Sequence, residues 1–217
     1  MNAVLHVISD RTRHRLPLLD SLVEAAKGGA DVIQVREKKA PASETYRLVR
    51  QLQDRLSAQK LSAGVFVNDR IDLAISADLA GVHLAAKSLP VRAAAGLRSR
   101  AGWSGRIGCS VHSLEEAVEA ERAGADYVTY GHIFASDSHP GLPPRGLGAL
   151  RRAVQALSIP VIAIGGIGPD NAGAVLDTGC SGVAVIGAVL GADNPREAAG
   201  ALKRAMRQSG RLAKIAF

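Results

Sequence analysis

The sequence is poor in several residue types on which particular classes of protein depend. Only two cysteines occur among its 217 residues, which excludes a disulfide-based fold and favours a reducing compartment. No apolar run approaches the roughly 18 residues that a membrane-spanning helix needs. No signal peptide is expected, because His6, Asp10 and Arg11 interrupt the first apolar stretch. These absences predict a cytoplasmic protein that does not bind a membrane.

Aromatic residues are also scarce, at 3% of the chain, too few for the stacking platforms of single-strand binders. The 27 basic residues exceed the 20 acidic ones, which gives a formal net charge of +7. Such an excess indicates nucleic-acid binding only when it gathers on one face. Here the arginines are scattered from Arg11 to Arg211. We therefore expect no nucleic-acid partner.

Eight short apolar runs recur along the chain, and each is bounded by turn residues. Near-continuous apolar character is typical of strands that are buried on both faces of a parallel sheet. The segments between them show helical spacing, with a capping box at Ser113–Glu116. The predicted strands cover residues 5–8, 32–35, 64–67, 81–84, 107–110, 127–130, 161–164 and 183–186.

Eight βα units in little more than two hundred residues, without a long linker, predict a compact (β/α)8 barrel. We expect this barrel to form a single domain over residues 1–217. A doubly wound sheet is the alternative, because it uses the same units. It is disfavoured because Ser9–Arg13, after the first strand, has no Gly-x-Gly-x-x-Gly pattern.

In such a barrel the chemistry lies just past the C-terminal ends of the strands. The loop after the seventh predicted strand contains Gly165 and Gly166, and the eighth is followed by Gly187 after Ile186. Small residues let an anion approach bare backbone N–H groups, so these two loops predict a phosphate site. The alternative is that the glycines only form tight turns.

Other candidate residues follow the remaining strands. His132 follows the sixth and is the natural group for moving a proton near pH 7. His6 and His83 lie within strands, where we expect interior residues. Arg36 and Lys38 offer two cations to a phosphate or carboxylate, the alternative being an ion pair with Glu37.

Patterns typical of two other kinds of catalytic site do not occur. The sequence has no His-x-x-x-His or Cys-x-x-Cys pair for zinc. It also has no Gly-x-Ser-x-Gly nucleophile motif. Asn68 and Asp69 could hold magnesium or orient a polar substrate, but one carboxylate is few for a hard cation. From the residues alone we expect a phosphate-handling barrel enzyme with a histidine acid/base and an unidentified substrate.

Several loop motifs resemble the thiamin phosphate synthase family in chain order and over essentially the whole length. They are Gln34–Lys38, Asn68–Arg70, Gly81–Leu84 and Ile164–Ile167. In that family a thiazole phosphate attacks a magnesium-bound pyrimidine pyrophosphate. The resemblance implies that Gln34, Arg36, Lys38 and Asn68 face the pyrophosphate, that Asp69 faces the magnesium, and that Gly166, Ile186 and Gly187 face the thiazole phosphate.

The sequence departs from this family at three places. Ser88 stands where the synthases carry a second magnesium-binding aspartate, and His132 stands where they carry a proline. Residues 136–139 lack the lysine that binds pyrophosphate. The same departures resemble a sister branch, the thiazole tautomerases (TenI proteins), in Ser110–Ala117, Gly131–Phe134 and Gly141–Gly146.

We therefore interpret the chain as a thiazole tautomerase, an isomerase that needs no metal or other cofactor. Resemblance implies that its substrate is a carboxylated thiazole phosphate. In this interpretation His132 would move the proton. The substrate would be bound by Arg36, Lys38, Asn68, Ser110, Ser136 and Ser138. Its phosphate would be bound by Gly165, Gly166, Ile186 and Gly187. The role of His139 stays open, as does any magnesium binding at Asp69.

Two alternatives remain open: a thiamin phosphate synthase with an altered metal site, and a non-catalytic regulatory or ligand-sensing barrel. The family also implies a dimer or another small homo-oligomer.

Overall fold

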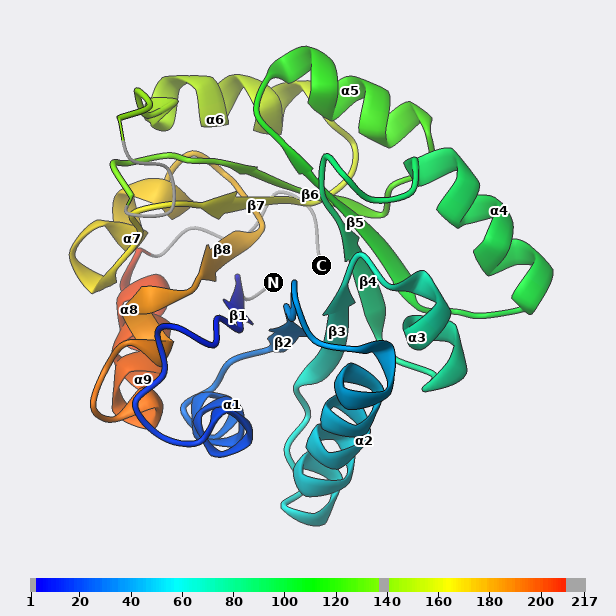
Figure 1. Ribbon diagram of the computed structural model, residues 1–217. Coiled ribbons are helices and arrows are strands. Elements are labelled where there is room, and N and C mark those ends of the chain that lie inside the picture. The colour runs from blue at the N-terminus through cyan, green and yellow to red at the C-terminus, as the bar shows by residue number, and fades with distance from the viewer. Residues whose placement is uncertain (1–2, 137–140, 210–217) are drawn as a thin grey trace.

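The computed structural model describes residues 3–136 and 141–209, and it has the predicted barrel architecture. Eight parallel strands pair in sequence order, and β1 also pairs with β8, which closes the barrel (Figure 1). The strands are β1 (Val4–Ile8), β2 (Val32–Val35), β3 (Gly64–Asn68), β4 (Gly81–Leu84), β5 (Arg106–Val111), β6 (Tyr127–Gly131), β7 (Val161–Ile164) and β8 (Gly182–Val185). The doubly wound alternative is excluded, because such a sheet is open.

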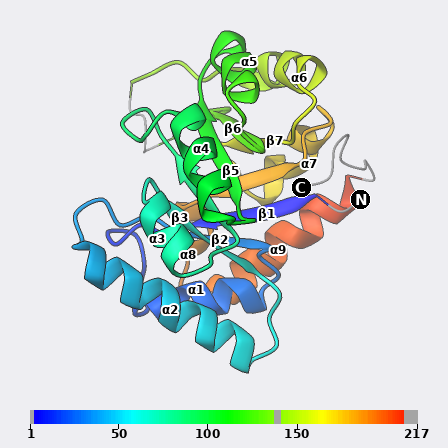
Figure 2. The ribbon, with the colours of Figure 1, turned by 90° about the vertical axis from the view of Figure 1, so that its right-hand side faces the viewer.

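The helices form a ring around the strands, except α8, which lies at the exit of β8. Figure 2 shows α5 and α6 on one side of the barrel and α1 and α2 on the other. The helices are α1 (Leu18–Lys27), α2 (Ala42–Ala58), α3 (Ile71–Ser76), α4 (Val91–Ala101), α5 (Leu114–Arg122), α6 (Gly146–Ala156), α7 (Pro169–Leu176), α8 (Gly187–Leu190) and α9 (Pro195–Gln208). None of the helices in the described residues is long and apolar enough to cross a membrane.

The helix-start signal at Ser113 is confirmed, with one difference in its second half. Ser113 is the N-cap of α5, and its side chain accepts a hydrogen bond from the backbone N–H of Glu116. The Glu116 carboxylate does not accept from Ser113, as in a full capping box, but from the backbone N–H of His112 at 2.6 Å. This bond ties the start of α5 to the loop that leaves β5.

Apolar side chains form two separate clusters, one between the strands and the helices and one inside the barrel. Phe66 and Tyr127 are the largest members of the inner cluster, and each occupies space left by a glycine on a neighbouring strand. A Cβ on Gly81 would lie 2.2 Å from the Phe66 ring, and one on Gly108 would lie 2.1 Å from the Tyr127 ring. The barrel interior is therefore packed, as in other barrels of this kind, whose ligands bind at the C-terminal ends of the strands.

Candidate active site

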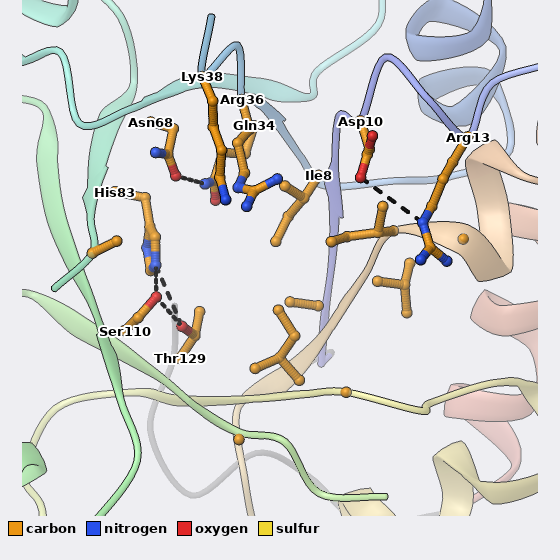
Figure 3. A pocket seen from close by; sticks show the side chains of 18 of the residues that line it. Ile8, Asp10, Arg13, Gln34, Arg36, Lys38, Asn68, His83, Ser110 and Thr129 are labelled. Atoms are coloured by element: carbon orange, nitrogen blue, oxygen red, sulfur yellow. Dashed lines mark hydrogen bonds and ion pairs between the residues drawn. The ribbon is translucent and has the colours of Figure 1, made fainter. Parts of the chain in front are cut away.

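A cavity of about 1060 Å³ lies at the C-terminal ends of the strands (Figure 3). It brings together all the predicted site residues that the structure describes. They are Arg36, Lys38, Asn68, Ser110, His132, Ser136, Gly165, Gly166, Ile186 and Gly187. Ser138 and His139 lie outside the described residues.

The two glycine-containing loops predicted to bind phosphate line this same cavity, but their glycines are constrained in different ways. Gly165 and Gly166 have φ angles of +101° and +66°, which side-chain-bearing residues rarely adopt. A Cβ on Gly165 would lie 2.3 Å from that of His132, and one on Gly166 would lie 2.4 Å from the Ala135 carbonyl oxygen. The chain leaving β6 therefore packs tightly over the loop after β7, so the tight-turn interpretation accounts for part of this glycine pattern.

Gly187 begins α8 and has no such crowding from the backbone. A Cβ there would lie 3.4 Å from Nη1 of Arg13, in the loop between β1 and α1. A guanidinium group thus reaches over the start of α8 from another loop. The sequence analysis did not assign Arg13 to the site.

Arg36 and Lys38 both line the cavity from the loop after β2, and Figure 3 shows their side chains pointing into it. The predicted alternative of an ion pair with Glu37 is not seen within the described residues. The Glu37 carboxylate instead pairs with Arg11 and accepts a hydrogen bond from Ser9 at 3.3 Å. Ser9 in turn accepts from the backbone N–H of Arg36 at 2.7 Å, so these bonds fix the loop that carries both cations.

A polar cluster centred on His83 forms part of the cavity wall. His83 Nε2 lies 2.8 Å from Ser110 Oγ and 3.3 Å from Thr129 Oγ1, and Nδ1 lies 3.0 Å from the Tyr127 hydroxyl. Burial lowers the pKa of His83 to about 4, with Arg36 adding to the lowering and Asp69 opposing it. At neutral pH the ring is therefore uncharged, and one of its nitrogens is an acceptor.

His83 was expected to be an interior residue, and it is buried. His83 also lines the cavity together with Thr129, and neither was among the residues predicted for the site. The signal was present in the strands themselves: Ser110 and Thr129 are register partners across β5 and β6. Polar residues in otherwise apolar strands near their C-terminal ends indicate the wall of a site.

A second polar chain connects β2, β3 and the loop after β4. Gln34 Nε2 donates to Asn68 Oδ1 at 2.9 Å, and Asn68 Nδ2 donates to Asp69 Oδ2 at 2.6 Å. The other oxygen of Asp69 accepts from the hydroxyl of Ser88, whose Oγ accepts from the backbone N–H of Ala85 at 2.7 Å. The predicted site residue Asn68 is thus held by partners on both sides.

His132 lies at the cavity, yet its side chain is almost fully buried, with the residue 5% exposed. Its Nε2 lies 3.2 Å from the carbonyl oxygen of Leu142. Because a carbonyl oxygen can only accept, Nε2 carries the hydrogen in this contact. The ring thus ties the exit of β6 to Leu142 in the following loop.

Cations, backbone-lined turns and fixed polar side chains around one cavity define a phosphate-handling barrel enzyme. A family model described as thiamine monophosphate synthase matches residues 5–189. The chain belongs to this family, which is enzymatic. It is 42% identical over 200 residues to a thiamine-phosphate synthase of Pyrococcus furiosus, covering 92% of this chain and 93% of the relative.

Further relatives carry the same name. The thiamine-phosphate synthase of Chlorobium luteolum is 43% identical over 204 residues, covering 94% of this chain and 92% of its own. A solved thiamine phosphate pyrophosphorylase from Pyrococcus furiosus superposes with a TM-score of 0.84 at 41% identity, covering 95% of this chain and 96% of that one. A 3-hexulose-6-phosphate synthase structure, at 20% identity and a TM-score of 0.70, shares the fold.

The interpretation as a thiazole tautomerase, and thus as an isomerase, is wrong: the two sequence relatives reported above are both named thiamine-phosphate synthase. It gave too much weight to three local departures. Where the second aspartate is missing, Ser88 still places an oxygen beside Asp69. Where a lysine is missing, Lys39 lines the cavity in addition to the two predicted cations. The regulatory alternative also finds no support in these names.

Proposed function

We propose that this chain is a thiamine-phosphate synthase, the alternative that the sequence left open. The observation that carries the proposal is that two anion-binding regions line one cavity. Arg36 and Lys38 lie on the loop after β2, and the glycine-containing loops follow β7 and β8. Two separate anionic groups, a diphosphate and a monophosphate, are what joining the two halves of thiamin phosphate requires. The names of the relatives support the same reaction.

In this reaction a bond forms between the thiazole ring nitrogen and the methylene carbon of the pyrimidine. The bond from that carbon to the diphosphate oxygen breaks, and pyrophosphate leaves with its electron pair. Arg36 and Lys38 would hold the leaving group, and Asn68 would donate an amide hydrogen to it. Charge-assisted hydrogen bonds of this kind strengthen as negative charge develops on the departing oxygen.

The polar cluster centred on His83 would orient the pyrimidine. Ser110 is close to both His83 and Thr129, so its hydroxyl is directed and can donate its hydrogen to a ring nitrogen of the pyrimidine. Ser136 lies at the cavity on the loop after β6 and would contact the substrate from there. Gly165, Gly166, Ile186 and Gly187 would hold the thiazole phosphate through the backbone.

His132 enters this proposal as a positioning residue. Its contacts include the Leu142 carbonyl oxygen, through the ring, and the backbone turn at Gly165, through Cβ. The bond formed in the transfer uses a ring nitrogen lone pair, so the reaction needs no proton removed by His132. The ring would instead keep the loop after β7 in the shape that receives the phosphate.

The resemblance to the synthases also implies magnesium, and the residues present fit it. Among the described residues no group of three or more His, Cys, Asp and Glu side chains could hold a metal ion alone. Magnesium, however, is commonly bound by one or two carboxylates together with substrate phosphates and water. The adjoining oxygens of Asp69 and Ser88 would hold it with the diphosphate. The chemistry a bound magnesium supplies is neutralisation of charge on the diphosphate.

The test is formation of thiamin phosphate and pyrophosphate when the protein is given both phosphorylated halves with magnesium. Arg36→Gln should reduce kcat/KM by about 10- to 100-fold, the range expected for a lost hydrogen bond to a charged group. Arg70→Gln is the matched control, because Arg70 pairs with Asp72 and does not line the cavity. The proposal fails if the wild-type protein makes no thiamin phosphate. The small homo-oligomer and the cytoplasmic location stay predictions.

A further inference from the structure

The loop between β1 and α1 carries three arginines at alternate positions, and each of them lies in different surroundings. Arg11 pairs with Glu37 and Glu44 on the side of β2. Arg15 pairs with Asp193, beyond α8. Arg13, between them, lines the cavity. The loop is thus anchored on both sides of Arg13.

Local hydrogen bonds set the conformation from which Arg13 projects. Asp10 Oδ1 accepts from the backbone N–H of Thr12 at 2.9 Å and from its hydroxyl at 2.7 Å. The backbone N–H of Arg13 donates to the Asp10 carbonyl at 3.1 Å. This tight turn aims the arginine side chain across the mouth of the barrel.

The Arg13 guanidinium is oriented by its contacts. Its Nε lies 3.9 Å from Asp10 Oδ2, as Figure 3 shows. Its Nη1 lies over Gly187, 3.4 Å from the point where a Cβ would stand. A side chain on residue 187 would therefore fill the space under the guanidinium.

Burial alone would raise the pKa of Asp10, but hydrogen bonds from Thr12, aided by the charges of Arg36 and Arg13, lower this pKa below its ordinary value. Asp10 is thus an anion that fixes one edge of the guanidinium.

Arg13 is separate from the cations of the diphosphate region. In Figure 3 it lies beyond Ile8 from Arg36 and Lys38, close to the chain around the start of α8. It adds a charged side chain to a region where the other proposed phosphate ligands are backbone groups. A guanidinium offers two parallel hydrogen bonds and a full positive charge to a phosphate, whereas backbone N–H groups contribute only partial charges.

We infer that Arg13 binds the phosphate of the thiazole substrate and makes the site select the phosphorylated thiazole over the free alcohol. The inference rests on the proposed function, because it assigns the thiazole phosphate to the β8 side of the cavity. It names a specificity residue for that substrate, not for the diphosphate.

The experiment compares Arg13→Gln with the wild-type protein and with Arg50→Gln, whose arginine lies exposed on α2 and does not line the cavity. Hydroxyethylthiazole phosphate, and separately the unphosphorylated alcohol, are titrated by calorimetry without the second substrate. We expect Arg13→Gln to weaken binding of the phosphate by about 10- to 100-fold, to leave binding of the alcohol unchanged, and to leave inhibition by pyrophosphate within about threefold. Arg13→Lys keeps the positive charge but loses the bidentate geometry of the guanidinium, so it should bind the phosphate more tightly than Arg13→Gln and less tightly than wild type.

The outcomes separate this inference from the proposed function. Unchanged phosphate binding in Arg13→Gln overturns the inference, even if the enzyme makes thiamin phosphate. Equal losses for the phosphate and the alcohol overturn it as well, because they indicate a disturbed loop. If the wild-type protein makes no thiamin phosphate, the proposed function fails, and the titration still reports whether Arg13 selects the phosphate. A normal circular dichroism spectrum and unfolding midpoint for Arg13→Gln establish that the variant is folded.

Discussion

His83 Nε2 lies 2.8 Å from the hydroxyl oxygen of Ser110, and this pair joins the packed barrel interior to the cavity. The same ring contacts the Tyr127 hydroxyl at 3.0 Å on its inner side. Ser110 lines the cavity, whereas Tyr127 is fully buried in the inner cluster. One histidine therefore connects a cavity-facing hydroxyl with one that is buried in the barrel interior.

This difference predicts opposite effects for two hydroxyl deletions. Ser110→Ala should lower kcat/KM for thiamin phosphate formation by about 10-fold or more, because the substrate loses a directed hydrogen bond, with little change in stability. Tyr127→Phe should lower the free energy of unfolding by about 1–2 kcal/mol and change kcat/KM by less than about threefold. Steady-state kinetics and urea unfolding of both variants check this. Comparable kinetic losses in both would contradict the assignment of Ser110 to the substrate.

His132→Gln tests whether His132 positions the phosphate loop or moves a proton. The glutamine amide can still donate to the Leu142 carbonyl, and the synthase reaction needs no proton taken by residue 132. We therefore expect both kcat and KM for the thiazole phosphate to stay within about threefold of wild type, because the contact that positions the loop is kept. A loss of kcat by several hundred-fold at unchanged KM would show instead that His132 acts in the chemical step.

Most of the fold could be predicted from the sequence because each strand is buried on both faces. The eight predicted strands differ from the observed ones by no more than a residue at either end, as for β5, predicted at 107–110 and observed at Arg106–Val111. A continuous apolar run bounded by turn residues fixes such a strand locally. Which edge of the sheet carries the chemistry then follows from the barrel topology.

The site was predictable only in part, because its remaining residues depend on packing between distant segments. Arg36, Lys38 and Gly187 follow directly after strands, so their position was sufficient to find them. Arg13 lies in a loop whose path is set by ion pairs made by Arg11 and Arg15 with segments far along the chain. No local sequence pattern predicts those pairings. Because the sequence is generally basic, nothing in it distinguishes Arg13 from the other arginines.

The activity was misjudged for a related reason. The replacement of an aspartate by Ser88 and the presence of His132 were interpreted as changes of chemistry. In the structure Ser88 still donates to Asp69. The His132 ring contacts the Leu142 carbonyl oxygen, and its Cβ lies against Gly165 in the loop after β7. A substitution in a motif shows that a group has changed, but its three-dimensional surroundings determine whether the function of the site changes with it.

Two of the three glycines in the loop after β7, Gly166 and Gly168, give a matched pair for testing the proposed phosphate site. Gly166→Ala places a methyl group 2.4 Å from the Ala135 carbonyl oxygen at a φ of +66°. Gly168→Ala adds a methyl group with nothing within 4 Å, at a φ of −141°. Gly166→Ala should therefore cost about 1–3 kcal/mol of stability.

Of the two variants, only Gly166→Ala should also raise KM for the thiazole phosphate, because the loop must shift to relieve the contact with the Ala135 carbonyl oxygen. Gly168→Ala should stay close to wild type in both respects. Thermal or urea unfolding and steady-state kinetics measure the two effects. If both variants raise KM equally, the loop is generally sensitive to substitution, and the close approach of Ala135 does not explain the requirement for glycine at residue 166.

His6, at the centre of the barrel, predicts how stability depends on pH. Burial lowers its pKa to about 3, the nearby His83 contributes to the lowering, and Gln34 opposes it. Within the described residues neither ring nitrogen has a hydrogen-bond partner. In the unfolded chain His6 has an ordinary histidine pKa of about 6.5. Between about pH 3 and pH 6.5 it is therefore protonated in the unfolded state and uncharged in the native state.

Because the unfolded state binds more protons in that window, the stabilisation is fully present above about pH 6.5 and is lost as the pH falls. The pKa of His83 is lowered to about 4 for the same reason, so acidification from pH 7 to pH 5 should remove about 2 kcal/mol for each of the two histidines. His6→Phe keeps a ring among Phe66 and Tyr127 but cannot titrate, so it should lose about 2 kcal/mol less than wild type over this range. Urea unfolding at pH 7 and pH 5 measures the difference, and an equal loss in both proteins would show that His6 is not the group whose protonation destabilises the barrel.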